Sequence, residues 1–209
     1  MGRRVRLPDG RHVDLSHFVE WRPYLWAGPV ARALEFLGDL QGKRVLEVGG
    51  RSGRMSCLFS LLGAETTMIE KANLSAARAE VEKWGLADRV RLIQSPDGFQ
   101  EVAGETFDAI FTKSVLWCIE LLAEMLDRFD AHLADRGKVA FVENYRGGKI
   151  LLWARRQIVR RERYTWEKDY FGITPEQIPL FKQRFRNVEV RRHRYFVYTI
   201  MGRKASANA

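Results

Sequence analysis

The sequence predicts an α/β fold of three layers, in which helices cover both faces of a mainly parallel, seven-stranded sheet. Strand-like and helix-like segments alternate from Arg44 to about Glu143, the order that parallel βαβ units produce. Residues 187–202 then read as two strands without a helix between them, which predicts an antiparallel closing strand at the C-terminal edge. The 209 residues, 46% of them hydrophobic, are enough for one sizeable core.

The elements follow from local patterns along the chain. Residues 5–15 alternate apolar side chains around an Asp-Gly turn, which is typical of a small hairpin. Helix-spaced Val30, Leu34 and Leu37 predict a helix within residues 21–40. We therefore divide the chain into an N-terminal hairpin and cap helix (1–40) and a main domain (41–209) with a lid-like insertion at about 146–180. The parallel strands are expected at 44–48, 66–70, 89–93, 107–112 and 138–143, and the closing pair at 188–192 and 195–201.

A glycine turn follows the first core strand, and a carboxylate ends the second. Gly49 and Gly50 are expected to take positive φ and to let the backbone approach a ligand, and Gly53 to let the next helix pack tightly on the sheet. Glu70, at the tip of the second strand, suits a bidentate grip on a ribose diol. The same glycines could be ordinary turn residues of any α/β domain. Together with Glu70 they indicate a nucleoside site.

The glycine spacing excludes a dinucleotide. Counting from Gly49, the pattern G-x-G-x-x-G would need glycine where Arg51 and Arg54 stand, and Arg51 would block a pyrophosphate. The remaining pattern, Glu47-x-Gly49-x-x-x-Gly53, resembles motif I of the class I S-adenosylmethionine-dependent methyltransferases. That motif is usually E/D-x-G-x-G-x-G, and Arg51 here takes the place of its central glycine.

The resemblance runs from about residue 43 to the C-terminus. Residues 84–97 are similar to the family's third strand, 106–117 to its fourth strand and substrate-side loop, and 137–144 to its fifth strand. It implies a Rossmann-like enzyme with S-adenosylmethionine as cofactor. Asp97, which would face the adenine, could equally be a turn residue that caps the next helix. The implied cofactor-binding residues are Glu47, Gly49, Gly50, Gly53, Glu70, Lys71, Ser95, Asp97 and Lys113.

Catalysis in such an enzyme needs positioning more than reactive side chains. A sulfonium methyl is already activated, so the protein must align the acceptor and remove its proton. Histidine is the usual base, and His17 lies in the N-terminal segment that often covers the site in the family. Glu143 and Tyr145, at the carboxyl end of the fifth strand, are alternatives. A purely structural role remains open for His17.

The segment 146–170 is basic and rich in aromatic residues. It could be a solvated helix face, a contact for an anionic acceptor or nucleic acid, or a helix that touches an anionic membrane surface. The net charge of +9 keeps the anionic partners open. The predicted acceptor contacts are Trp117, Trp153, Arg156 and Arg160.

Composition restricts the cellular compartment and the class of protein. No run approaches the ~18 apolar residues of a membrane span. Cys57 and Cys118 lack metal-ligand spacing and are expected to be free thiols in the cytoplasm, so no metal site is predicted. The sequence thus predicts methylation, preferably on oxygen, of a small polar or anionic acceptor such as a sugar, glycan or natural-product intermediate. The alternatives are an RNA methyltransferase and a regulatory protein that binds a nucleotide without catalysis.

Overall fold

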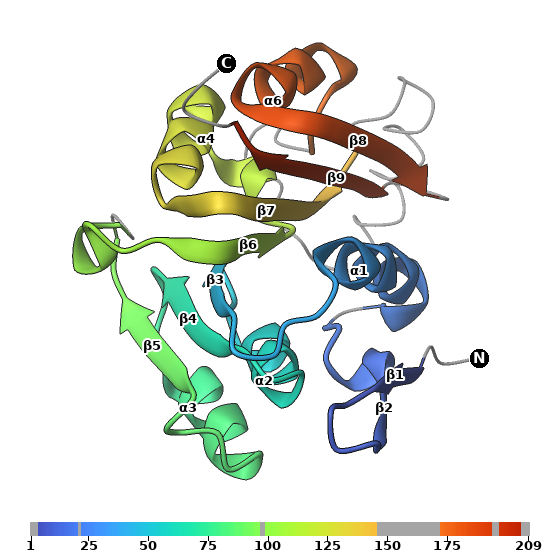
Figure 1. Cartoon of the computed structure of the whole chain (residues 1–209), viewed down its shortest axis with the longest axis vertical. Coiled ribbons are helices and arrows are strands. Elements are labelled where there is room, and N and C mark those ends of the chain that lie inside the picture. Colours follow the sequence, from blue (N-terminus) through green and yellow to red (C-terminus); the bar gives the residue numbers. More distant parts are fainter. Residues whose placement is uncertain (1–3, 21, 97–98, 146–171, 194–196, 206–209) are drawn as a thin grey trace, which may run out of the picture.

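A seven-stranded sheet forms the centre of the computed structural model, which describes residues 4–20, 22–96, 99–145, 172–193 and 197–205 (Figure 1). Its strand order is β5-β4-β3-β6-β7-β9-β8, and only β9 runs antiparallel to its neighbours. The three-layer fold with an antiparallel closing strand is therefore confirmed. The strands are β3 (Arg44–Val48), β4 (Glu65–Glu70), β5 (Val90–Gln94), β6 (Phe107–Lys113), β7 (Leu133–Asn144), β8 (Phe185–His193) and β9 (Val197–Lys204).

Helices cover both faces of the sheet. Figure 1 shows α1 and α2 on one side and α4 on the other, and the buried residues divide in the same way. The helices are α1 (Pro23–Leu37), α2 (Arg54–Leu61), α3 (Ser75–Lys83), α4 (Leu122–Ala131) and α6 (Ile178–Arg184), with 3-10 helices η1 (Leu15–His17), η2 (Gln100–Val102), η3 (Leu116–Cys118) and η4 (Pro175–Gln177).

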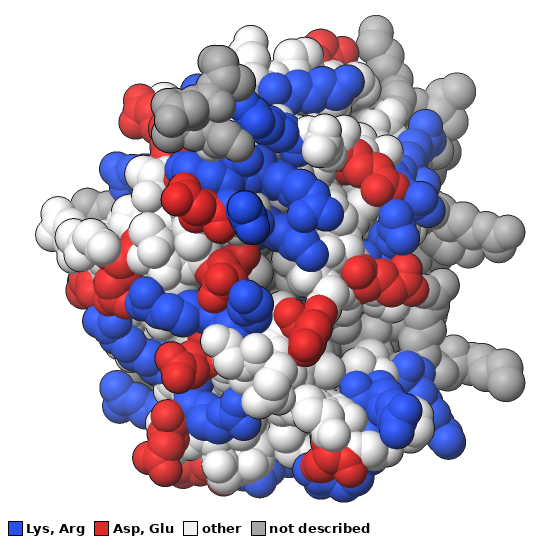
Figure 2. Space-filling model, in the orientation of Figure 1, with Lys and Arg blue, Asp and Glu red and all other residues white. Residues whose placement is uncertain are grey.

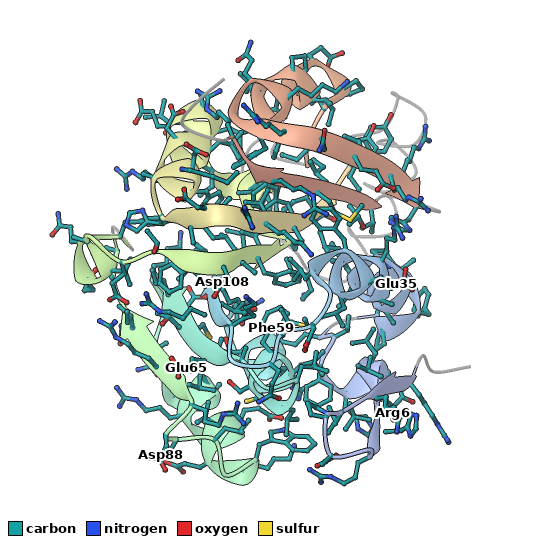
Figure 3. The ribbon with its side chains drawn as sticks, viewed as in Figure 1. Arg6, Glu35, Phe59, Glu65, Asp88 and Asp108 are labelled. Carbon is teal, nitrogen blue, oxygen red and sulfur yellow. The ribbon has the colours of Figure 1, made fainter. Side chains whose placement is uncertain are left out.

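Strand alternation builds one core on each face of the sheet. Successive side chains of a strand point to opposite faces, so Val45 of β3 packs toward α1 and α2 while Leu46 packs toward α4. On the first face, Phe59 of α2 lies 5.0 Å from Phe111, centroid to centroid (Figure 3). On the second face, Phe141 of β7 stacks on Phe129 of α4. These ring contacts hold the helices at fixed positions on the sheet.

The N-terminal segment packs on the main sheet. Strands β1 (Arg4–Arg6) and β2 (His12–Asp14) form the expected hairpin, and α1 covers β7 and β9. Proline in the first turn of α1 suits a helix start, and Lys138 of β7 donates hydrogen bonds to the last carbonyls, those of Phe36 and Leu37. The division of the chain at residue 40 stays a prediction.

Two strands are longer than predicted. β7 begins at Leu133 instead of 138, because a register irregularity between Phe107 and Ala109 of β6 extends the pairing back to Leu133. β8 begins at Phe185 instead of 188, and its register also shifts, between Arg186 and Glu189. Both extensions contain polar residues, so they lack the apolar pattern by which a strand is found. Residues 146–171 of the expected insertion, with Trp153, Arg156 and Arg160, lie outside the described residues, as does Asp97.

Candidate active site

The carboxyl ends of the parallel strands meet at one edge of the sheet. Gly49 follows β3, Glu70 ends β4, Lys113 ends β6, and Tyr145 follows β7. β3 lies between β4 and β6, so the chain's crossovers leave in opposite directions on either side of it. In open α/β sheets this switch point is where ligands bind. The fold thus brings together candidates that are up to about a hundred residues apart in the sequence.

The glycine turn after β3 is sterically required, although not wholly in the way the sequence suggested. Gly49 has φ +74°, and a Cβ there would lie 2.4 Å from Cγ2 of Val115. The expectation that Gly50 also takes positive φ is wrong; the left-handed conformation falls on Arg51, with φ +45°. Gly50 is needed for space instead, because a Cβ would lie 2.5 Å from Sδ of Met68.

Gly53 serves a helix–helix contact. It has φ +72° at the start of α2, and a Cβ would lie 3.1 Å from Cβ of Ala77 in α3. The sequence analysis expected this glycine to bring α2 onto the sheet. Its closest neighbour is α3 instead, so Gly53 sets the spacing of the two helices that flank the carboxyl ends of β3 and β4.

Glu70 links the glycine turn to the end of β4. Its carboxylate is 7% exposed and accepts hydrogen bonds from the backbone N–H groups of Arg51 and Ala72, each at 3.0 Å. A carboxylate has about four acceptor positions, so further hydroxyl donors can be accommodated. Arg51 is therefore compatible with the turn, because its backbone N–H holds Glu70 while its side chain is exposed.

The next two candidates lie beside Glu70. Lys71 is exposed directly after β4. Ser95 is buried at the end of β5, and its N–H donates to the carbonyl of Glu70 at 3.0 Å. Thus β3, β4 and β5 present a continuous row of candidate cofactor contacts at this edge.

Two ionisable groups of opposite charge lie on the α1 side of the same edge. Glu47 of β3 is 2% exposed and accepts a hydrogen bond from the Ser56 hydroxyl; burial raises the pKa of Glu47 to about 7. The Lys113 ammonium lies 5.2 Å from the centroid of the Trp26 ring. Burial lowers the pKa of Lys113, and the carboxylates of Glu47, Glu20 and Glu143 oppose that shift.

Glu143 is completely buried and holds the loop after β6. Its carboxylate accepts hydrogen bonds from the Thr112 hydroxyl at 2.7 Å and from the N–H groups of Val115 and Leu116 at 2.9 and 3.0 Å. Burial raises the pKa of Glu143 to about 7, while these donors favour the charged form. The carboxylate is occupied by its own protein's donors, which makes it a positioning group in this geometry.

Ser114 is the second fixed point of that loop. It has φ +57°, its hydroxyl accepts from Asn144 Nδ2 at 2.7 Å, and its carbonyl accepts from Trp117 Nε1 at 2.7 Å. Trp117, a predicted acceptor contact, is thereby held in place beside the site. Because Val115 also abuts Gly49, this loop connects β6, β7 and the glycine turn.

Two tyrosines and an arginine lie at the carboxyl end of β7, where Tyr198 of β9 pairs with Glu143 and Arg192 of β8 pairs with Tyr198. The rings of Tyr145 and Tyr198 are 4.4 Å apart, and the Arg192 guanidinium lies 4.7 Å from the centre of the Tyr145 ring. Burial, together with the neighbouring Tyr145, raises the pKa of Tyr198. His17 is exposed at the end of η1. The sequence analysis did not identify Trp26, Ser56, Ser114, Arg192 or Tyr198, because no motif marks them and only folding brings them to this edge.

The described residues also bear on metal binding, thiol reactivity and membrane crossing. Within the described residues, no cluster of three or more His, Cys, Asp or Glu side chains could hold a metal ion. Cys57 is a buried free thiol, and burial raises its pKa to about 12. In the described part of the chain, no helix is long and apolar enough to cross a membrane.

Comparison with known proteins identifies the family of this chain. A family model described as a methyltransferase domain matches residues 18–184, so the chain belongs to the methyltransferase family. No curated protein matches the sequence. The predictions of a class I methyltransferase, of an enzyme and of S-adenosylmethionine as its cofactor are confirmed.

Solved structures share the fold. The apo form of the S-adenosylmethionine-dependent methyltransferase SibL superposes with a TM-score of 0.66 at 18% identity, over 85% of this chain and 54% of that one. The mitomycin 7-O-methyltransferase MmcR gives 0.61 at 18%, over 84% and 52%. A methyltransferase from Thiobacillus denitrificans, in complex with S-adenosyl-L-homocysteine, gives 0.52 at 22%, over 65% and 56%. This chain thus spans about half the length of these three proteins.

Proposed function

We propose that this methyltransferase transfers the methyl group of S-adenosylmethionine to an oxygen of a small polar or anionic acceptor, such as a sugar or a natural-product intermediate. The observation that carries the proposal is the group of Tyr145, Tyr198 and Arg192 at the carboxyl end of β7. It offers phenol hydroxyls and a guanidinium beside the loop that ends β6. Such groups suit an acceptor rich in oxygen.

Residues at the carboxyl ends of β3 to β5 fit the cofactor. Glu70 retains acceptor positions for ribose hydroxyls, and the space at Gly50 is closed to any side chain. The hydrogen bonds described for the Glu47 carboxylate come from Ser56 alone, which leaves acceptor capacity that suits the cofactor's ammonium group. Lys71, Ser95 and Asp97 stay predicted contacts with the nucleoside. When bound, the cofactor would supply a methyl group on a positively charged sulfur, so that a nucleophile can attack the methyl carbon while the sulfur leaves as a neutral thioether.

The chain's own residues then position the acceptor and take its proton. We assign Glu143 to positioning, because its oxygens already accept hydrogen bonds from three donors of the β6 strand and the loop after it. His17 and Tyr145 remain the candidates for the proton acceptor. The variants His17→Ala and Tyr145→Phe separate them. Removal of the true base should lower kcat and abolish the limb of the pH profile that its ionisation produces.

RNA is the runner-up acceptor. One basic cluster consists of Lys138, Lys43 and Arg203. Burial is the main cause that lowers the pKa of Lys138, and the nearby charges of Arg203 and Lys43 lower it further. Lys43 directly precedes β3, Arg203 lies near the end of β9, and Lys138 of β7 pairs with Arg203, so all three lie toward the end of the sheet opposite to the glycine turn. Figure 2 shows acidic side chains interspersed with basic ones over one face of the protein. Neither feature favours a nucleic acid at the proposed site. Contact with a membrane or a glycan through residues 146–171 stays an alternative.

A screen of acceptors with methyl-labelled S-adenosylmethionine tests the proposal. We expect label in hydroxyl-bearing small molecules, with the product O-methylated by mass spectrometry, and little dependence of turnover on salt. Label in RNA alone, with binding that weakens steeply as salt rises, would overturn the choice of acceptor. Binding of the cofactor without turnover on any acceptor class would favour the regulatory alternative.

A further inference from the structure

We propose that the Lys113 ammonium binds the carboxylate of the cofactor's amino-acid end, and thereby makes the site select the whole cofactor over adenosine thioethers that lack this group. The inference rests on the cofactor placement proposed above. It adds a charged contact that lies outside the glycine turn and depends on this chain's own lysine at the end of β6.

Strand register places Lys113 beside the turn. β3 and β6 pair in parallel with Val48 opposite Thr112, so the next residues, Gly49 and Lys113, lie side by side at the point where the two strands end. Side chains alternate along β6, and Lys113 shares the face of Phe111, which packs toward α1 and α2. Glu47 of β3 lies on this same face. The lysine therefore sits where the amino-acid end of a cofactor held by Glu47 would lie.

The charge of Lys113 is not neutralised by a direct contact. Within the described part of the chain it has no hydrogen bond and no ion pair, and its contact is the face of the Trp26 ring at 5.2 Å. Glu20, Glu47 and Glu143 attract it from a distance, while Arg51 repels it. An ammonium group that is largely withdrawn from water without an acceptor is unfavourable, and a ligand carboxylate relieves this cost.

Trp26 gives a second indication of a missing acceptor. The indole ring is 2% exposed, and its N–H, which is buried, has no hydrogen-bond acceptor among the described residues. Buried indole N–H groups usually have a partner. Two donors next to each other, Lys113 and Trp26, thus lack acceptors at this edge. A carboxylate has enough acceptor positions for both.

The pair of Glu47 and Lys113 matches the charges of the ligand. An amino-acid end carries one ammonium and one carboxylate, and the site offers one carboxylate and one ammonium on neighbouring strands. The Lys113 ammonium lies over the buried Trp26 ring, and opposite charges beside such an apolar surface attract more strongly than they would in solvent. Burial lowers the pKa of Lys113, and a bound carboxylate would favour its charged form again.

The experiment compares two ligands that differ in the amino-acid end. S-adenosylhomocysteine carries it, whereas 5′-methylthioadenosine has the same adenosine thioether without it. For Lys113→Met, calorimetry should show affinity for S-adenosylhomocysteine reduced about 10- to 100-fold, the scale of a lost charge-assisted hydrogen bond, with affinity for 5′-methylthioadenosine unchanged. Lys113→Arg should restore part of the loss. Lys43→Met, at the opposite end of the sheet, should change neither affinity.

Each other outcome has a definite meaning. If Lys113→Met lost affinity for both ligands equally, the lysine would only support the fold. This result would overturn the inference and leave the proposed function intact. Unchanged affinity for S-adenosylhomocysteine would overturn it too. Failure of the wild-type protein to bind either ligand would remove the proposed cofactor placement itself. If Lys113→Met does not fold, Lys113→Arg and Lys113→Gln give the same comparison.

Discussion

Glu47 shows how a buried carboxyl group at the candidate site can destabilise the fold that carries it. Its side chain is 2% exposed, with a single hydroxyl donor and no direct ion pair among the described residues, so burial raises its pKa from 4.5 to about 7. A carboxyl group in such a place favours its neutral form. The unfolded chain, in contrast, ionises it near its ordinary value.

This difference predicts a pH-dependent cost. Between pH 4.5 and 7 the folded protein holds a proton that the unfolded chain releases, so rising pH favours unfolding, and above pH 7 the loss stays constant. Glu47→Gln removes the effect. The variant should be as stable as wild type near pH 4.5 and more stable by about 3 kcal/mol at pH 8. Urea unfolding across this range measures the difference, and a gap that does not change with pH would contradict the prediction.

Glu70 carries the second prediction at the scale of single residues. Glu70→Ala should weaken binding of S-adenosylmethionine by roughly 1 to 3 kcal/mol, because it removes a carboxylate acceptor and frees the N–H groups of Arg51 and Ala72. Calorimetry measures the change. Glu65→Ala is the matched control, since Glu65 is exposed at the other end of the same strand (Figure 3). Equal affinities for the two variants would mean that Glu70 does not hold the ribose.

At the scale of elements, the turn after β3 and the loop after β6 form one unit. Val115 fills the space over Gly49, Glu143 accepts the N–H groups of Val115 and Leu116, and Asn144 holds Ser114. Three strands therefore contribute to one rigid arrangement. A change in either segment should move the other, since neither has room to shift alone.

Gly49→Ala tests this coupling. Gly49 and Gly42 both have positive φ, +74° and +67°, so alanine at either position costs about 1 kcal/mol in backbone strain. Only at Gly49 would the new Cβ meet a neighbour, Val115, whereas no atom lies within 4 Å at Gly42. We expect Gly42→Ala to bind the cofactor normally. Gly49→Ala should bind it more than about tenfold more weakly, and should be less stable than Gly42→Ala by about 1–3 kcal/mol. Similar cofactor affinities in the two variants would mean that the turn after β3 and the loop after β6 are not coupled.

At the scale of the whole molecule, the N-terminal segment is part of the core. Trp26, Val30 and Ala33 of α1 are buried in the same cluster as Val142 of β7 and Met201 of β9. Arg32 of α1 also pairs with Glu189 of β8 at 3.1 Å. The division at residue 40 thus marks a change in local structure and crosses a continuous core.

Removal of residues 1–40 should therefore abolish cooperative unfolding. Each large apolar side chain of α1 contributes about 1.5–3 kcal/mol through burial, and several together approach the total stability of a domain. Calorimetry or urea titration of the fragment 41–209 measures this. Removal of residues 1–10 alone, which breaks the hairpin but keeps α1, should leave a cooperative transition. A fragment 41–209 that unfolds cooperatively would show that the main sheet is independent of α1.

The sequence predicted most of the sheet and several residues of the candidate site. Strands with strong apolar runs, such as β3 and β6, lie where they were expected, because their burial pattern is local. Polar extensions such as residues 133–137 of β7 were missed, since only pairing with β6 makes them strands. The glycine turn and Glu70 could be proposed as ligand contacts because a strand, a glycine turn and a strand that ends in a carboxylate form a pattern that can be recognised within a short stretch of sequence.

Only the tertiary structure showed which groups surround the charged side chains of the candidate site. Nothing in the sequence places Trp26 over Lys113, or Arg192 over Tyr145, because these pairs are 87 and 47 residues apart and meet only when α1 and β8 pack on the sheet. Nor does composition show that Glu143 is occupied by the backbone of the loop after β6. Sequence patterns report short-range geometry and burial. The pKa and the free hydrogen-bonding capacity of a side chain depend on which distant groups surround it, and those are fixed by the packing of the whole molecule.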